Sequence, residues 1–198
     1  MSDLRPFQPR AAHLILACVL ATLAFTVADL ATKAWALEEL SRERVGEPPA
    51  LCENQGFQRI RSSPIVLVDG YLELQYAENC GAAFGILSDA SPGARATIFG
   101  VAALGAILVL FWMFASGRGG KFFAYSVPLI VSGAIGNLHD RFQYGYVVDF
   151  IRAHWQDAAE WPTFNIADAT ITIGIVLMLI DGFIDGARAR AAGEQPAP

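Results

Sequence analysis

Two aspartates in this chain stand among apolar residues, and neither has a Lys or Arg within two positions. Asp149 lies in the run VVDFI, residues 147–151, and Asp168 lies near the start of a long apolar segment, with no Lys or Arg three or four positions away. An apolar environment disfavours the charged form of a carboxyl group, which suits it to proton transfer near neutral pH. Two such carboxyls that face each other share one proton, so one partner can activate water while the other polarises a carbonyl. The pattern predicts aspartic-protease chemistry.

Other polar residues stand close to the ends of apolar segments. Asn165 lies three positions before Asp168, so a helix would place both side chains on one face. The remaining candidates are Asn79, Asn137, Arg141, Asp29, Lys33 and Asp140. For Asp29 and Asp140 we favour a structural role, as a helix cap or as a partner of Lys33 or Arg141.

The sequence lacks the motifs that metal, phosphate or nucleic-acid chemistry would require. His13, His139 and His154 are isolated, and no pair of His or Cys has the spacing of metal ligands. The sequence also has no glycine-rich phosphate loop and no basic stripe with interleaved aromatics. We therefore expect no metal, no cofactor and no nucleic-acid partner.

Composition indicates the elements that must position these residues. The chain has 198 residues, of which 54% are hydrophobic, and the apolar residues gather in blocks at 11–28, 94–115, 122–138 and 164–184. A hydrocarbon core of roughly 30 Å requires about 20 helical residues, and backbone polar groups in lipid must be bonded internally. The sequence predicts an α-helical integral membrane protein with four transmembrane helices, forming a single domain over residues 1–186.

Basic residues in the short segments predict the orientation. Arg118 and Lys121 lie in the tight turn between the second and third blocks, and both terminal segments carry arginines. These segments are predicted to be cytoplasmic, so both termini face inward, with a disordered tail at 187–198. More than half of the Lys and Arg lie in segments that this orientation places on the outer side of the membrane. Most of these lie in one long loop, where the rule that positive residues stay inside is weaker.

This orientation brings the polar ends of several segments to one plane near the outer side of the membrane. An ionisable residue at membrane depth costs at least ~2.5 kcal/mol, so we interpret the cluster as a functional site. The proton or ion site of a small transporter is an alternative, although such sites lie near the midplane rather than at the rim.

The outer region, residues 38–92, combines a loop with a predicted hairpin. Its first part mixes charge, Pro and Gly and is predicted to be loop. Residues 65–68 and 71–76 are rich in β-branched and aromatic residues and are joined by Asp69-Gly70, a strong hairpin signal. A small β-sheet at the outer membrane surface is expected.

Two features of this outer half leave alternatives open. Ala34-Trp35-Ala36 is similar to a signal-peptide cleavage site, but Asp29 and Lys33 stand before it, so an uncleaved helix is favoured. Cys52 and Cys80 would both face the oxidising side and could pair.

Four motifs, in order and spacing, resemble those of the lipoprotein signal peptidase (signal peptidase II) family. They are VADLATKAW, ENCGAAFGIL, GAIGNLHDRFQYGYVVDFI and FNIADATITIG. The resemblance implies a four-helix aspartyl endopeptidase of the bacterial cytoplasmic (inner) membrane. Such an enzyme cleaves a prolipoprotein just before its diacylglyceryl-modified cysteine, with the active site near the outer, periplasmic face.

The resemblance also assigns roles. It makes Asp149 and Asp168 the catalytic pair, and it decides between Asp149 and Asp140, which the residues alone separate weakly. Supporting or substrate-binding roles fall to Asn79, Asn137, Arg141 and Asn165, and structural roles to Asp29, Lys33, Asp140 and Gly81. Partners would be the prolipoprotein and membrane lipids, and a monomer is expected.

The sequence departs from the family pattern at Cys80, Gly85 and His139, and the loop before the hairpin is longer than expected for the family. No catalytic group is lost. A catalytically inactive lipoprotein-binding relative is the remaining alternative.

Overall fold

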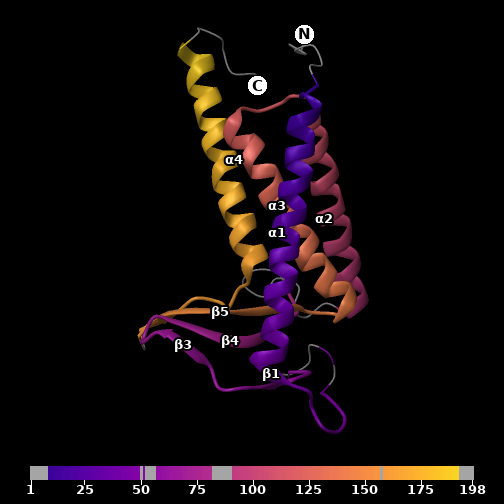
Figure 1. Cartoon of the computed structure of the whole chain (residues 1–198), viewed down its shortest axis with the longest axis vertical. Coiled ribbons are helices and arrows are strands. Elements are labelled where there is room, and N and C mark those ends of the chain that lie inside the picture. Colours follow the sequence, from indigo (N-terminus) through magenta and orange to yellow (C-terminus); the bar gives the residue numbers. More distant parts are fainter. Residues whose placement is uncertain (1–8, 50, 52–56, 82–90, 157, 192–198) are drawn as a thin grey trace.

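The computed structural model describes residues 9–49, 51, 57–81, 91–156 and 158–191. Its four helices are α1 (Ala12–Glu39), α2 (Pro92–Ala115), α3 (Lys121–Gln143) and α4 (Ile166–Ala191). All four are long and apolar enough to cross a membrane, and they run along one common direction (Figure 1). Large apolar side chains on their outer faces are exposed, among them Val101 and Phe183. A water-soluble protein would bury this surface, so the predicted multi-pass membrane protein is confirmed.

The helices differ from the predicted ranges mainly in being longer. α1 was expected to end near Asp29 and Lys33 but continues to Glu39. The segment AWALEE after Lys33 contains good helix formers and no Gly or Pro, and an Asp29–Lys33 pair at i and i+4 supports the helix across this point. α3 extends to Gln143 and α4 to Ala191. Residues 187–191 are therefore helical rather than part of a tail, and 192–198 lie outside the described residues.

α3 is the central helix and packs against the other three. Small residues allow these close approaches: a Cβ at Gly133 would overlap the backbone oxygen of Ala167 on α4, and one at Gly136 would overlap the Asp29 carboxylate on α1. Away from the sheets, the bundle is filled by a cluster of buried residues: Cys18, Phe114, Phe123, Val127 and Val131.

The end of α4 farther from the sheets caps the beginning of α3. The backbone N–H of Gly120 donates to Asp181 Oδ2 at 2.7 Å, and that of Phe122 donates to Oδ1 at 3.1 Å. These are N–H groups that a helix start leaves unpaired, and a carboxylate there also complements the helix dipole. Asp181 was not singled out in the sequence, because a cap supplied by another helix leaves no local pattern.

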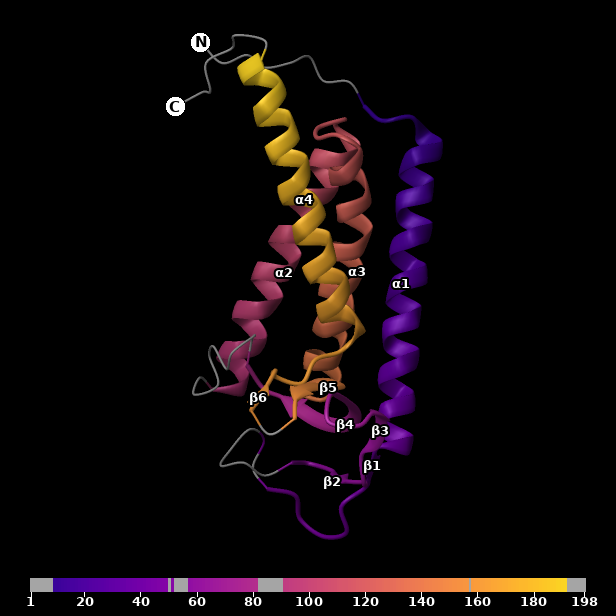
Figure 2. The same cartoon turned by 90° about the vertical axis from the view of Figure 1, so that its left-hand side faces the viewer.

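A four-stranded antiparallel sheet lies at one end of the bundle. Its strands are β3 (Ile65–Val68), β4 (Leu72–Asn79), β5 (Val147–Trp155) and β6 (Ala159–Glu160), in that order. Gly70 adopts a φ of 74° in the predicted Asp69-Gly70 turn, a conformation that favours glycine. Figure 2 shows the strands gathered below the helices. The small sheet expected from the hairpin signal is confirmed, but β5, which carries Asp149, was not predicted as a strand.

Part of the expected loop also forms strands. β1 (Ser41–Arg42) and β2 (Ile60–Arg61) pair antiparallel as a separate two-stranded sheet. Each strand is only two residues long, too short to show an alternating pattern in the sequence.

The larger sheet is fixed to the last turns of α1. A buried cluster joins them: Ala36, Leu40, Tyr76, Tyr146, Val148 and Phe150. Because residues 34–36 lie inside a continuous helix and Ala36 is fully buried, these residues belong to the folded protein and not to an exposed cleavage site. α1 begins, and α4 ends, at the opposite end of the bundle (Figure 1).

Candidate active site

Asp149 lies on β5 at the point where the sheet meets the bundle. Its side chain is buried, with 1% of its surface exposed. Asn79 Nδ2 donates to Oδ2 at 3.0 Å, and Asn165 Nδ2 donates to Oδ1 at 2.7 Å. Burial, followed by the neighbouring charge of Asp168, raises the pKa of Asp149 to about 8. Asp149 is therefore held in place by amide donors and can carry a proton at neutral pH.

Asp168 lies in the first turn of α4 and forms a reciprocal pair with Asn165. The Asn165 backbone N–H donates to Asp168 Oδ2 at 3.2 Å, and the Asp168 N–H donates to Asn165 Oδ1 at 3.0 Å. This is the geometry of a capping box, which starts the helix and orients both side chains. Asn137 Nδ2 on α3 donates to the other carboxylate oxygen, Oδ1, at 2.8 Å.

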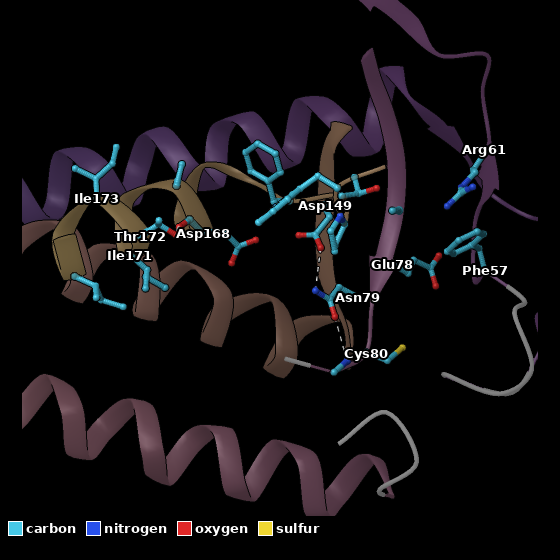
Figure 3. Close-up of a pocket in the computed structure, with 18 residues that line it drawn as sticks. Phe57, Arg61, Glu78, Asn79, Cys80, Asp149, Asp168, Ile171, Thr172 and Ile173 are labelled. Carbon is cyan, nitrogen blue, oxygen red and sulfur yellow. Dashed lines mark hydrogen bonds between the residues drawn. The ribbon is translucent and has the colours of Figure 1, made fainter. Parts of the chain in front are cut away.

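The two aspartates line one cavity of about 1000 Å³. One end of this cavity follows apolar side chains of α4, including Ile171, Ile173 and Ile175. Figure 3 shows Asp149 and Asp168 between this apolar end and the outer end at Phe57, Arg61 and Glu78. A chain running along the cavity would therefore pass from the membrane side to the water side by way of both carboxyls.

Lys33 determines which way the Asn137 amide points. Its Nζ donates to Asn137 Oδ1 at 2.8 Å. An ammonium group only donates, so the oxygen of this amide must face Lys33 and its nitrogen must face Asp168. Asn165 Nδ2 approaches the same oxygen at 3.1 Å. Lys33, Asn137 and Asp168 thus form a directed chain of hydrogen bonds from α1 to the cavity.

Asp29 and Asp140 hold Lys33 rather than line the cavity. Their carboxylates lie 2.9 Å and 3.2 Å from Lys33 Nζ, and all three side chains are buried. Each also accepts a backbone N–H, from Ala167 to Asp29 and from Val148 to Asp140. The expected pairing with Lys33 is present for both aspartates, and this network joins α1, α3, α4 and β5.

Arg141 connects α3 to the segment that follows β4. Its guanidinium donates to the carbonyls of Gly81 at 2.8 Å and Asn137 at 3.1 Å, and it lies 4.4 Å from the centroid of the Phe99 ring on α2. The Gly81 N–H donates to Asn79 Oδ1 at 3.1 Å, which leaves Asn79 Nδ2 for Asp149. Arg141 and Gly81 therefore act through Asn79 on the position of Asp149.

Of the positions at which the sequence departs from the family pattern, the structure describes His139 and Cys80. His139 is half exposed and contacts Asp140, while Cys80 lines the cavity and is disulfide-bonded. Cys52 and Gly85 lie outside the described residues. Sequence reasoning did not find the outer-end side chains Phe57, Arg61, Glu78 and Trp161. They come from three segments that are distant in the sequence and line one cavity only in the folded chain.

Comparisons with known proteins agree with this arrangement. The protein family described as signal peptidase (SPase) II matches residues 21–184. A lipoprotein signal peptidase of Clostridium tetani is 35% identical over 164 residues, covering 80% of this chain and 90% of its own length. One of Pseudomonas putida is 39% identical over 119 residues, covering 60% of this chain and 70% of its own length.

A solved structure described as a bacterial membrane enzyme has the same fold. It superposes with a TM-score of 0.64 at 23% identity, over 92% of this chain and 94% of its own length. The family match covers α2 and α3, most of α1 and α4, and both strands that carry site residues. The chain belongs to the signal peptidase II family of membrane peptidases.

Proposed function

We propose that this protein removes the signal peptides of bacterial prolipoproteins, with Asp149 and Asp168 as an aspartic catalytic pair. The observation that carries the proposal is the shared cavity. Both carboxyls line it, both are oriented by asparagine amides, and its walls change from apolar side chains on α4 to polar groups on the sheet. Family membership supplies the class of substrate.

The shape of the cavity fits a substrate that is itself embedded in the membrane. The signal helix and the acyl chains would lie beside the apolar end of the cavity, where each buried CH₂ contributes about 0.8 kcal/mol. The bond before the diacylglyceryl cysteine then lies between the aspartates, and the rest of the lipoprotein leaves past the sheet. Anchoring by lipid would explain selectivity for the modified precursor.

In the proposed reaction the pair begins with one shared proton. The ionised carboxylate takes a proton from water as the water oxygen attacks the scissile carbonyl carbon, while the protonated carboxyl donates to the carbonyl oxygen. As the resulting gem-diol collapses, one of its hydroxyl groups returns a proton to the ionised carboxylate, the C–N bond breaks, and the leaving amine receives a proton from the other carboxyl. The dyad returns to its starting state with one proton, so atoms and charge balance.

The pKa of Asp149, raised to about 8, suits it to hold the shared proton. Asp168 lies in the first turn of α4, where the helix dipole favours negative charge. We therefore assign the proton of the resting pair to Asp149 and the water-activating role to Asp168.

The proposed setting is the cytoplasmic membrane, with a monomeric enzyme. The sheets and the outer end of the cavity face the periplasm, and both chain termini face the cytoplasm. The basic residues Arg118 and Lys121, in the turn between α2 and α3, support this orientation.

The activity can be tested with a precursor prepared in two forms that differ only in the diacylglyceryl group on the cysteine. The purified protein, in detergent or lipid, should cut the modified form directly before the cysteine, as mapped by mass spectrometry, and leave the unmodified form intact. Binding of the modified precursor without any cleavage would instead identify a catalytically inactive relative.

A further inference from the structure

The outer end of the cavity carries a cation that the proposed reaction does not use. Arg61, on β2, lines the cavity together with Phe57, Glu78 and Trp161. Figure 3 shows Arg61 and Phe57 at the opposite end of the cavity from Ile171 and Ile173, with Asp149 and Asp168 between them. Arg61 thus lies on the side where the substrate would pass into water.

The guanidinium of Arg61 is held by a ring and not by an acid. It lies over the Phe57 ring, with 3.9 Å between its central carbon and the ring centroid. Within the described parts of the chain, its N–H groups make no hydrogen bond and no ion pair. Stacking leaves the edge of the guanidinium plane free, and that edge is the part that binds a carboxylate with two parallel hydrogen bonds.

The neighbouring acids are already engaged by other groups. Glu78 accepts hydrogen bonds from the backbone N–H groups of Gln58 and Arg59 and from the Tyr76 hydroxyl. On the adjoining strands, Arg152 binds both Glu73 and Glu160. Arg61 differs in this respect from Arg59, Arg141 and Arg152, each of which donates to protein acceptors.

We propose that Arg61 forms a subsite for a carboxylate side chain in the substrate, located shortly after the modified cysteine. The inference rests on the proposed function, because the direction of the chain through the cavity follows from the scissile bond lying between the aspartates. An extended chain advances about 3.3–3.6 Å per residue, so only the first few residues of the mature lipoprotein can reach this end of the cavity. The enzyme would therefore prefer Asp or Glu at one of these positions over an amide or a cation.

The test uses lipid-modified precursors that differ at a single residue. Asp, Asn or Lys is placed in turn at the second to the fifth position of the mature chain, counting the modified cysteine as the first, and kcat/KM is measured for each. At one position, the wild-type protein should cut the Asp substrate roughly two- to fivefold faster than the Asn substrate, as expected for a partly exposed pair. The difference should appear mainly in KM, because Arg61 would bind the carboxylate equally well in the bound substrate and in the transition state.

Two substitutions and a matched control separate this contact from a general effect of charge or stability. Arg61→Gln should bring the Asp/Asn ratio to about one, and Arg61→Glu should reverse the order, so that the Lys substrate is preferred over the Asp substrate. Arg42→Gln is the control: Arg42 is exposed on β1, which pairs with β2, and it does not line the cavity. This control should keep the wild-type ratio.

The outcomes distinguish the subsite from the function on which it depends. If the wild-type protein cuts the Asn substrates but shows no Asp preference at any position, or keeps its preference in Arg61→Glu, the subsite is wrong and the peptidase activity stands. If it cuts none of the lipid-modified precursors, the proposed function is wrong and the subsite is rejected with it.

Discussion

At the scale of single residues, the site depends on amide groups whose orientation is imposed from outside the cavity. Asn137 accepts from Lys33 and donates to Asp168, and Asn79 accepts from the Gly81 N–H and donates to Asp149. In each case one partner can only donate, so the amide presents its nitrogen to the carboxylate. The buried charges around Lys33 thus help to orient the proposed catalytic pair as well as to hold the helices together.

This relation predicts the effect of Asn137→Asp. The new carboxylate can still bind Lys33 but cannot donate to Asp168, and it adds a negative charge beside it. Cleavage should fall by about 100-fold, since small changes in the position of a catalytic group have effects of this size. Single-turnover rates with the lipid-modified precursor would measure it. His139→Gln, close by on α3 and half exposed, should keep nearly the wild-type rate; equal rates for wild type and Asn137→Asp would show that the donor is dispensable.

A second residue-level prediction concerns the proton on Asp149. Its pKa rises from an ordinary value of 3.8 to about 8 in the folded protein. Between these values the native state binds more protons than the unfolded state, so this group contributes stability at low pH that is lost as the pH rises through about 8. Asp149→Asn removes the titration.

The thermal midpoint of the Asp149→Asn variant, relative to wild type, should therefore be more favourable at about pH 8.5 than at about pH 5.5. Each 1 kcal/mol corresponds to a shift of about 2–4 °C for a chain of this size. Thermal unfolding of both proteins in the same detergent gives the comparison. If the thermal midpoints of the two proteins differ by the same amount at both pH values, the raised pKa of Asp149 is contradicted.

Sequence reasoning at this scale identified the residues but not their connections. Asp149 and Asp168 stood out because their immediate neighbours in the sequence are apolar. The hydrogen bonds from Lys33 through Asn137 to Asp168 join three helices. The spacing of residues within a single segment therefore could not reveal them. Arg61 was hidden for a similar reason, because it reaches the cavity through the pairing of β2 with β1.

At the scale of elements, a strand and two helices position the proposed catalytic pair. β5 pairs with β4, and Asp149 stands opposite Ala77, two residues before Asn79. The strand was missed because VVDFI is apolar on both sides of the aspartate, which is typical of a strand buried on both faces but also of a buried helix. All four transmembrane segments and the hairpin were predictable, since length and turn residues specify them.

The link from α4 to α3 at Asp181 can be tested by itself. Asp181→Ala leaves the N–H groups of Gly120 and Phe122 without their acceptor, so the protein should lose about 1–2 kcal/mol, as for other helix caps. Denaturation in detergent would measure the loss. Asp185→Ala is the matched control on the same helix, because its pair with Arg188 is exposed and contributes little. Equal stability of the two variants would mean that the cap is unimportant.

At the scale of the whole molecule, a membrane-length bundle carries a polar sheet at one end and the cavity at their junction. The number and nature of the helices followed from composition, because a hydrocarbon core restricts both. The cavity could not be predicted from composition, because its walls come from β2, β4, β5 and α4, which are distant in sequence. The resemblance of the four motifs to signal peptidase II is confirmed by the family match, and it had pointed to site residues in these separate segments before any contact was known.

The orientation in the membrane gives a prediction at this scale. Val45, in the outer region, is 98% exposed, and Arg118, between α2 and α3, is also exposed. In intact cells stripped of their outer membrane, a membrane-impermeant maleimide should label Val45→Cys but not Arg118→Cys, after subtraction of labelling in the parent protein. The reverse pattern would place the cavity on the cytoplasmic side and contradict the proposed topology.

The most direct test of the central claim is the single-turnover rate of cleavage by Asp149→Asn and Asp168→Asn, each shown to be folded by its thermal midpoint. Because each aspartate has a separate task in proton transfer, each variant should lose at least ~100-fold in rate on the lipid-modified precursor. Asp185→Asn should cut as fast as wild type. If either dyad variant, folded and bound to the precursor, cuts within a few-fold of the wild-type rate, Asp149 and Asp168 do not form the catalytic pair.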